Sequence, residues 1–432
     1  MELISKIIKH AEKYGNAEVI ISSHNASSIV FEHNNLSNIS AGKVSEMHIR
    51  LSNDGKFGFS KTNNISEWEK CLKNAYSIMK ASEPLDLDVV ITQKNKYPNV
   101  KGIFSKKIEN LDKETRLNKM KEMMQVAKLI DNRINISTVE SATDSLELQF
   151  ANSNGVNAFN RSNIISCGVE MNIKDVSGYE MKVSHDLFDF NKIGKSGAEL
   201  CISSLNPMPV KTMKGDLVLD YFAVADILHT ILVPAFAADN VQTNNSFLKG
   251  KLGKEVFSKR LTIVDNALLN GGVFSRPFDI EGVKSQKTML VDKGIVKNYL
   301  YDNYSARKDK VKSTGNCAGL QKIPYVGSSN FVVSPGKYSK EQIISETKKG
   351  IFAKTAFGTH VANVLTGDVS IGVSSAFYIE NGEIVHPIKQ AMVSFNLFEA
   401  LKNIQLIGKE LRQETDVVAP ILRLDNVQII GN

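Results

Sequence analysis

Histidine is the residue type in this sequence with the most direct route to metal chemistry, and the chain contains eight of them. They are His10, His24, His33, His48, His185, His229, His360 and His386. Zinc sites built on one helix place two histidines about a turn apart, with a glutamate that takes a proton from metal-bound water. The nearest two histidines here, His24 and His33, are nine residues apart. The sequence therefore contains no helical zinc motif.

His229 has the most unusual neighbours of the eight. It belongs to the stretch LHTILVPA, within an apolar run over residues 221–238 that also includes Asp226 and Pro234. No second histidine shares the face that Asp226 and His229 would occupy on a helix. This pattern favours a histidine with ordinary hydrogen bonds on a buried helix. A metal site assembled from residues remote in sequence stays open.

A cysteine nucleophile is a second chemistry that the sequence suggests. Residues 315–319 read GNCAG, the small-residue frame of a nucleophile elbow with Cys317 at its centre. Such an elbow requires a strand before it and a helix after it, whereas the residues on either side of this frame are polar or non-helical. A tight turn that holds a small buried thiol is the favoured interpretation. A catalytic Cys317 is the alternative, and it would make this chain a hydrolase by itself.

Thr366-Gly367-Asp368 is the other compact polar cluster, and it comes just before an expected strand. A glycine turn is the simplest interpretation, although its polar groups could hold a peptide backbone or a partner loop. The glycine motifs of phosphate-binding loops are absent from the sequence. The four cysteines form no CxxC pair, so a cysteine-rich zinc module is not expected.

Composition is that of a globular protein, with 432 residues, 42% hydrophobic and 23% charged. The formal charge of +7 is spread along the chain without a basic stripe interleaved with aromatics, which argues against nucleic-acid binding. No unbroken apolar stretch is long enough to cross a membrane. No signal peptide is recognisable at the N-terminus, and a cytoplasmic protein with reduced thiols is expected.

Hairpins and helices alternate along the chain without a βαβ rhythm, which predicts an α+β fold. Turn dipeptides between apolar strands predict hairpins at 53–55, 154–155 and 381–382. Periodicity predicts helices over 67–82, 109–131, 197–205, 341–352 and 397–412. The expected domains are an N-terminal α+β unit (1–84), a linker (85–108), a central α+β unit (109–215) and a larger, mainly antiparallel C-terminal domain (216–432).

Three stretches together resemble the TldD/PmbA family, in its TldE (PmbA) branch. They are residues 275–316, residues 365–388 and the tail over 396–411 and 419–432. The spellings F-D-x-E-G-V, Y-S-A-R-K, S-T-G and T-G-D followed by I-E-N-G-E-I occur in that order. The first 215 residues fit the layout of the family but carry little diagnostic sequence.

The resemblance implies a zinc site that this chain lacks. TldD-like members carry HExxxH early in the C-terminal domain and a cysteine ligand near the C-terminus. The resemblance places this motif on residues 230–235, so that Thr230 and Ala235 stand at the histidine positions and Ile231 at the glutamate position. A slip of one residue would restore His229 alone. No cysteine lies between 414 and 432.

By resemblance, this chain is expected to be the non-catalytic partner in a heterodimer with a TldD-like subunit, which carries the zinc. The pair would degrade unfolded or short peptides, and the chain by itself could form a homodimer. Asn316, Thr366 and Asp368 are the candidates for contact with peptide or partner. A regulatory binding protein of the type named for modulation of DNA gyrase is a further alternative.

Overall fold

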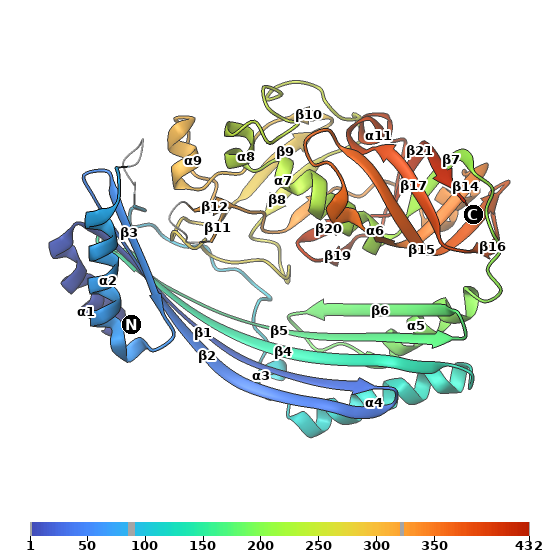
Figure 1. The fold of residues 1–432 in the computed structure, drawn as a ribbon, viewed down its shortest axis with the longest axis horizontal. Helices are drawn as coiled ribbons and strands as arrows, with labels where there is room; N and C mark the ends of the chain where they lie inside the picture. The colour runs from blue at the N-terminus through green and yellow to red at the C-terminus, as the bar shows by residue number, and fades with distance from the viewer. Residues whose placement is uncertain (1, 85–90, 320–323, 432) are drawn as a thin grey trace.

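The first half of the molecule is built on one curved antiparallel sheet, which Figure 1 shows passing beneath the C-terminal half. The computed structural model describes residues 2–84, 91–319 and 324–431. The strand order is β3-β2-β1-β4-β5-β6. The strands are β1 (Asn16–Glu32), β2 (Asn35–Asn53), β3 (Lys56–Thr62), β4 (Asn135–Asn152), β5 (Asn157–Ile173) and β6 (Val176–Ser184). The expected N-terminal and central units therefore share a single sheet, joined where β1 pairs with β4.

Each half of this sheet repeats the same pattern of a helix, three strands and a helix. Helices pack on opposite ends of the sheet, each pair over its own apolar core. They are α1 (Glu2–Ala11) and α2 (Trp68–Ala81) at one end, and α4 (Lys113–Ile130) and α5 (Phe190–Ser203) at the other, with the short α3 (Lys106–Glu109) before α4. Gly58 and Gly178 allow the close helix contact, because a Cβ would lie 1.9 Å from Ala75 O or 2.1 Å from Gly197 O.

The C-terminal half contains a small closed barrel and a second sheet. The ring β14-β7-β21-β17-β15 closes because β15 also pairs with β14. Its strands are β7 (Met213–Leu219), β14 (Lys349–Phe357), β15 (Asp368–Glu380), β17 (Ala391–Asn396) and β21 (Leu422–Ile430), with β16 (Glu383–Ile388) and β18 (Leu406–Ile407) alongside. The second sheet contains β10 (Ile295–Val296), β9 (Lys287–Asp292), β8 (Ile263–Asn266), β13 (Phe331–Val333), β20 (Val417–Ala419) and β19 (Arg412–Glu414), in that order.

The apolar run over residues 221–238 lies in the largest core, against both of these sheets. It forms α6 (Tyr221–Ile227), a π-helical turn (Leu228–Leu232) and α7 (Val233–Ala235), followed by α8 (Ala238–Gln242). Other short elements are α9 (Asn303–Lys308), α10 (Lys340–Ser345), α11 (Leu397–Asn403) and the pair β11 (Cys317–Gly319) and β12 (Tyr325–Val326). In the described chain, no helix is both long and apolar enough to span a membrane.

The α+β fold is confirmed, and so are the three hairpins and the helix over 67–82. The long helices over 341–352 and 397–412 are wrong. The first ends at Ser345, and Gly350 lies in strand β14, where a Cβ would stand 2.0 Å from Asp216 O on β7. This glycine allows the two strands to pack closely. In the sequence it follows a helical pattern, which is also where a glycine that ends a helix would stand. The second helix ends at Asn403, because the following residues pair with strands of the two sheets.

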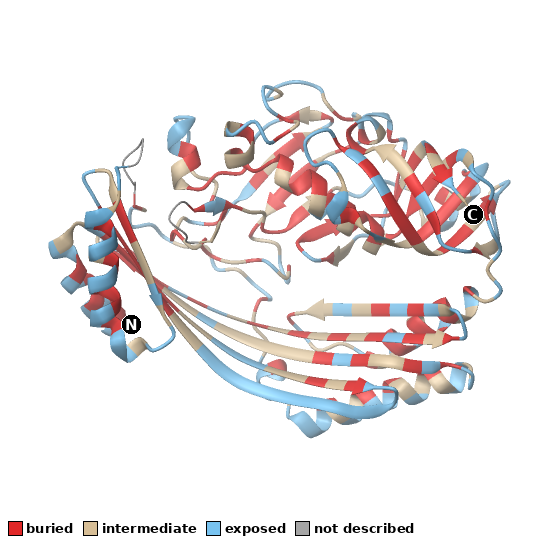
Figure 2. Ribbon diagram, in the orientation of Figure 1, coloured by how far each residue is buried: buried red, intermediate tan, exposed pale blue. Residues whose placement is uncertain are grey.

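The domain boundaries stay a prediction. Figure 2 shows that burial changes along the long strand β2 of the shared sheet. The outer half of β2, from Asn35 to Ser45, is exposed or half-buried, whereas its inner half is buried against α1 and α2.

In the expected linker, residues 91–108 are described, and the Thr92 hydroxyl donates to the Glu281 carbonyl at 2.7 Å. The linker therefore lies against the C-terminal half.

Candidate functional site

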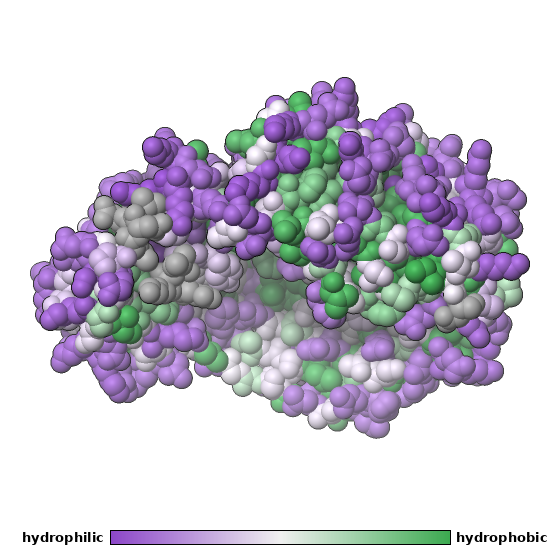
Figure 3. Space-filling view, turned by 45° about the horizontal axis from the view of Figure 1, so that its top comes forward, coloured by the Kyte–Doolittle hydropathy of each residue, from purple (hydrophilic) through white to green (hydrophobic). Residues whose placement is uncertain are grey.

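The surface is hollowed between the curved sheet and the C-terminal half, as Figure 3 shows near its centre. Two cavities of about 510 and 570 Å³ adjoin there, sizes typical of ligand pockets. The first, here called the sheet cavity, is walled by side chains of β1, β2, β4 and β5 and by residues 273–280. The second, the helix cavity, is walled by His229, Pro234 and residues near Asp416. Phe274, Arg276 and Tyr325 line both cavities.

His229 is half-exposed in the helix cavity and is tied to the C-terminal region. Its Nδ1 atom lies 2.5 Å from Oδ1 of Asp416, in the turn between β19 and β20, and Ser328 donates to the other carboxylate oxygen. This hydrogen bond raises the pKa of His229. Burial alone would raise the pKa of Asp416, but the bonds from His229 and Ser328 lower it below its usual range. The two groups therefore form an ion pair when His229 is protonated.

The π-helical turn decides which residues of this segment reach the cavity. In a π turn, residues five apart lie one above the other, and His229 and Pro234 both line the cavity. Ile231 and Ala235 are buried in the core instead, at 0% and 2% exposure, and Thr230 is half-buried. The slot at Thr230, Ile231 and Ala235 stays a prediction, and His229, one residue before it, is the histidine of this segment that reaches the cavity. The slot itself supplies no imidazole, and a register one residue earlier supplies only that of His229.

The residues of the helix cavity do not fit a zinc ion. A catalytic zinc takes three protein ligands, and Asp416 already accepts from both His229 and Ser328. Arg276 adds a positive charge to the same wall. Within residues 2–84, 91–319 and 324–431, no three His, Cys, Asp or Glu side chains are placed to hold a metal. The chemistry of this wall is that of a binding surface with one titratable imidazole.

Cys317 and Asn316 lie in a buried polar network rather than on a cavity wall. Burial raises the pKa of the Cys317 thiol well above its usual range, and the nearby Glu281 and Asp279 carboxylates raise it further. Since the thiolate is the nucleophile, this environment gives an inert thiol. Asn316 is 1% exposed and donates to Asp265 at 2.8 Å and to the Gly327 carbonyl at 3.0 Å. Its surroundings fit a structural role.

Thr366 is exposed on the turn before β15 and Asp368 is exposed at the first position of β15, and neither is among the residues that line the two cavities. The Thr366 hydroxyl donates to Asp368 at 2.7 Å, and Asn396 donates to the other carboxylate oxygen at 2.9 Å. These bonds keep the turn together. Contact of either residue with peptide or partner stays a prediction.

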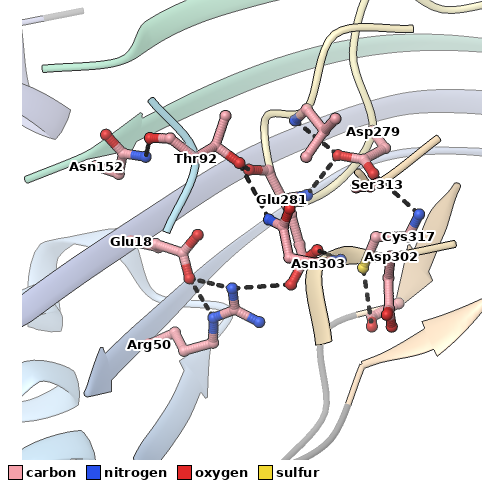
Figure 4. A network of polar contacts seen from close by, with 12 residues as sticks. Glu18, Arg50, Thr92, Asn152, Asp279, Glu281, Asp302, Asn303, Ser313 and Cys317 are labelled. Atoms are coloured by element: carbon pink, nitrogen blue, oxygen red, sulfur yellow. Dashed lines mark hydrogen bonds and ion pairs between the residues drawn. The ribbon is translucent and has the colours of Figure 1, made fainter. Parts of the chain in front are cut away.

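A buried ion-pair cluster joins the sheet to the C-terminal half beside the sheet cavity (Figure 4). Arg50 on β2 pairs with Glu18 on β1 and, at 3.1 Å, with Glu281 of the C-terminal half. All three side chains are 2% exposed. Asn303 donates its backbone N–H to Glu281 at 2.9 Å. This cluster holds strands β1 and β2 against the C-terminal half at one side of the hollow. No local sequence pattern predicts it.

Asp416 and Arg276 are the site residues that sequence reasoning missed. Asp416 lies 187 positions from His229 in the chain, in the turn between β19 and β20, and the pairing of β20 with β13 helps to place it beside the imidazole. Arg276 stands in an irregular loop without periodicity. Neither position carries a local signal that could have found it.

The sequence matches family models for all three parts of one metallopeptidase. Residues 17–78 match PmbA/TldA metallopeptidase domain 1, residues 106–205 the central domain, and residues 212–431 the C-terminal domain. An uncharacterized protein of Methanocaldococcus jannaschii is 32% identical, over 92% of this chain and 93% of that protein. Metalloprotease PmbA of Escherichia coli O157:H7 is also 32% identical, over 55% of this chain and 51% of its own.

Solved structures share the whole fold. TldE from Thermococcus kodakarensis superposes with a TM-score of 0.92 at 22% identity, over 99% of this chain and 100% of that one. A Thermotoga maritima protein, solved under a name that refers to modulation of DNA gyrase, also reaches 0.92 at 24% identity, over 99% of each chain. At these identities the likeness shows the fold. With three family models matched in order and 32% identity over nearly its full length, the chain belongs to the PmbA/TldD metallopeptidase family.

Proposed function

We propose that this chain is a non-catalytic subunit of a zinc peptidase. A TldD-like subunit carries the zinc, and this chain forms part of the wall of a peptide-binding chamber. The observation that carries the proposal is the helix cavity, where the helix of the family's zinc motif presents one imidazole, tied to Asp416, with Pro234 five residues later. In the TldD-like partner, zinc would activate the water that hydrolyses the peptide, and this wall supplies none of its ligands.

The shape of the hollow supports a peptide as the substrate. The sheet cavity lies between the sheet and the C-terminal half, and the helix cavity adjoins it within the C-terminal half. Together they form a groove whose walls combine apolar side chains with a few polar groups. Such a groove accepts an extended chain more readily than a folded domain, and extended peptides commonly bind along strands. The relatives named as metalloproteases supply the reaction class.

Hydrolysis by this chain alone is not favoured, because the Cys317 thiol is buried and protonated at neutral pH. In the sequence the net positive charge does not gather into a basic stripe interleaved with aromatic residues, so nucleic-acid binding is not favoured.

Metal content and peptidase activity, measured on this chain alone and in a mixture with a TldD-like subunit, test the proposal. We expect no stoichiometric zinc and no cleavage by the chain alone, and cleavage in the mixture that chelators abolish. The variant His229→Ala should assemble with the partner and keep most of kcat, because the imidazole is not a metal ligand. Zinc-dependent cleavage by the isolated chain, or loss of kcat in an intact His229→Ala complex, would overturn the proposal.

A further inference from the structure

Arg276 occupies the junction of the two cavities. It lies in the loop after β8, where its backbone N–H donates to the Ala267 carbonyl at 2.9 Å. Its side chain is half-buried and lines both the sheet cavity and the helix cavity, next to the exposed rings of Phe274 and Tyr325. A ligand that extends from one cavity into the other must therefore pass this guanidinium.

The guanidinium of Arg276 has no hydrogen-bond or ion-pair partner among the described residues. Its Nε and Nη2 atoms are buried, and no acceptor faces either of them. These two atoms form one edge of the planar group, the edge that binds a carboxylate through two parallel hydrogen bonds. Buried donors without acceptors are costly, so a suitable acceptor gains their full interaction. With no bond restraining its torsions, the side chain can turn this edge toward the groove that it lines.

The positive charge of Arg276 acts on two buried carboxyl groups, those of Asp265 and Asp279, but neither is available as its hydrogen-bond acceptor. Burial raises the pKa of Asp265, and of Asp279 to about 7, and the charge of Arg276 offsets part of each shift. Asp265 accepts from Ser329 and Asn316 at 2.7 to 2.8 Å. Asp279 accepts three backbone N–H groups at 2.8 to 3.0 Å. The charge of Arg276 therefore acts on both carboxyls, while its own donors remain unused.

The sheet cavity beside Arg276 has an apolar wall. Ile20 and Leu148 lie on its sheet side, and Phe278 and Ile280 on its C-terminal side. At about 510 Å³, this cavity has room for more than one amino-acid side chain. An apolar side chain gains binding free energy in proportion to the surface that it buries in such a place. The guanidinium of Arg276 beside this apolar cavity is therefore complementary to a ligand that carries a carboxylate next to an apolar group.

We infer that Arg276 binds a carboxylate of the peptide, and that the sheet cavity holds the apolar side chain beside it. This inference rests on the proposed function, since it names the substrate group that the wall recognises. The C-terminal carboxylate of a peptide that ends in an apolar residue meets both requirements at once. A glutamate or aspartate side chain carries the same chemistry, and the test separates these two sources.

Binding of four labelled peptides to the full chain tests the inference. An unstructured decapeptide ending in leucine, with a fluorophore at its N-terminus, is compared as the free acid and as the C-terminal amide. Two further amides carry glutamate or glutamine as the next-to-last residue. We expect the free acid to bind about ten- to a hundredfold more tightly than its amide, the range of a charge-assisted bidentate pair. The two amides with glutamate or glutamine should bind alike if the terminal carboxylate is the ligand.

Variants at Arg276 show whether the preference comes from this side chain. Arg276→Gln should remove the difference between acid and amide and leave binding of the amide unchanged. Arg276→Lys should keep a few-fold preference, because it retains the charge without the fork. Arg260→Gln is the matched control, since Arg260 is exposed and bonds Gln405 outside both cavities. Thermal melting checks that each variant is folded.

The outcomes separate this inference from the proposed function. Equal binding of acid and amide, or a preference that survives Arg276→Gln, would overturn the role of Arg276 and leave the peptide chamber standing. A preference for the glutamate amide over the glutamine amide would assign the carboxylate to a side chain instead of the terminus. If no peptide binds this chain and the mixture with a TldD-like subunit shows no cleavage, both the inference and the proposed function fail.

Discussion

Arg50 and Arg276 lie on either side of the same hollow, and they differ in what surrounds them. Arg50 pairs with two carboxylates, one from the sheet and one from the C-terminal half, and all of its interactions are internal. Arg276 has no such partner among the described residues. His229 is intermediate in this respect, since it is half-exposed and pairs with one carboxylate. The comparison indicates that a cation with all its partners holds the fold together, whereas a cation without them is available to a ligand.

Removal of Arg50 should have the largest effect on stability. Arg50→Met leaves Glu18 and Glu281 buried without a counter-charge, and breaking a buried pair in this way costs about 3–5 kcal/mol. Trp68, the single tryptophan, lies in the N-terminal core and reports unfolding of that half by its fluorescence. Urea unfolding of Arg50→Met should show this loss. A change below about 1 kcal/mol, within the range of exposed pairs, would contradict the comparison.

Cys317 offers a second measure of the same cluster. Its thiol is buried next to Glu281, and in the native protein it should react with iodoacetamide only through transient opening. Since opening follows stability, Arg50→Met should increase the labelling rate by about a hundredfold or more. Mass spectrometry of the Cys317 peptide gives the rate, with the buried Cys201 of the distant α5 region as the internal control. An equal increase at both cysteines would mean that the whole protein, rather than the hollow, has opened.

The His229–Asp416 pair should contribute about 1 kcal/mol, because His229 is half-exposed and solvent screens the interaction. The raised pKa of His229 means that its contribution is complete below about pH 6.5 and is lost as the pH rises through the folded pKa. The lowered pKa of Asp416 means that its contribution is present above about pH 4 and is lost on further acidification. Asp416→Asn should therefore destabilise most between about pH 4 and 6.5.

Unfolding of wild type and Asp416→Asn across pH, together with NMR titration of the His229 ring, measures this window. His229→Gln should remove the pH dependence of the difference above about pH 5, because the neutral amide cannot titrate and only Asp416 does so at lower pH. A difference that is constant from pH 5 to 9 would show that the pair is held by hydrogen bonding alone.

Arg276 should have the smallest effect on stability. Arg276→Met removes a cation without hydrogen bonds and adds an apolar side chain, so the free energy of unfolding should change by less than about 1 kcal/mol in either direction. The same urea unfolding that is applied to Arg50→Met measures it. A loss as large as that of Arg50→Met would place Arg276 among the structural cations and break the comparison.

Local sequence patterns predicted the turns of this fold well and the contacts of its site poorly. The dipeptides Asn154-Gly155 and Asn381-Gly382 require backbone conformations that few residues adopt, and each lies at a hairpin as expected. A glycine such as Gly350 is expected both where a helix ends and where two strands approach closely. The sequence around it could therefore not show which of the two structures it serves. His229 could be singled out from its apolar neighbours, whereas Asp416 could not, because their contact depends on how the sheets pair.

The pairing of β1 with β4 also has a consequence for the order of folding. Glu18 on β1 lies opposite Asn152 on β4, and the intervening residues already form α2 and the hairpin of β2 and β3. Contacts between residues so distant in the chain form slowly, because the loop must close before they are gained. Each half has its own core, so we expect the two halves to collapse first and the centre of the sheet to gain protection from hydrogen exchange last. During synthesis, the strand that later lies at the middle of the sheet is for a time its exposed edge.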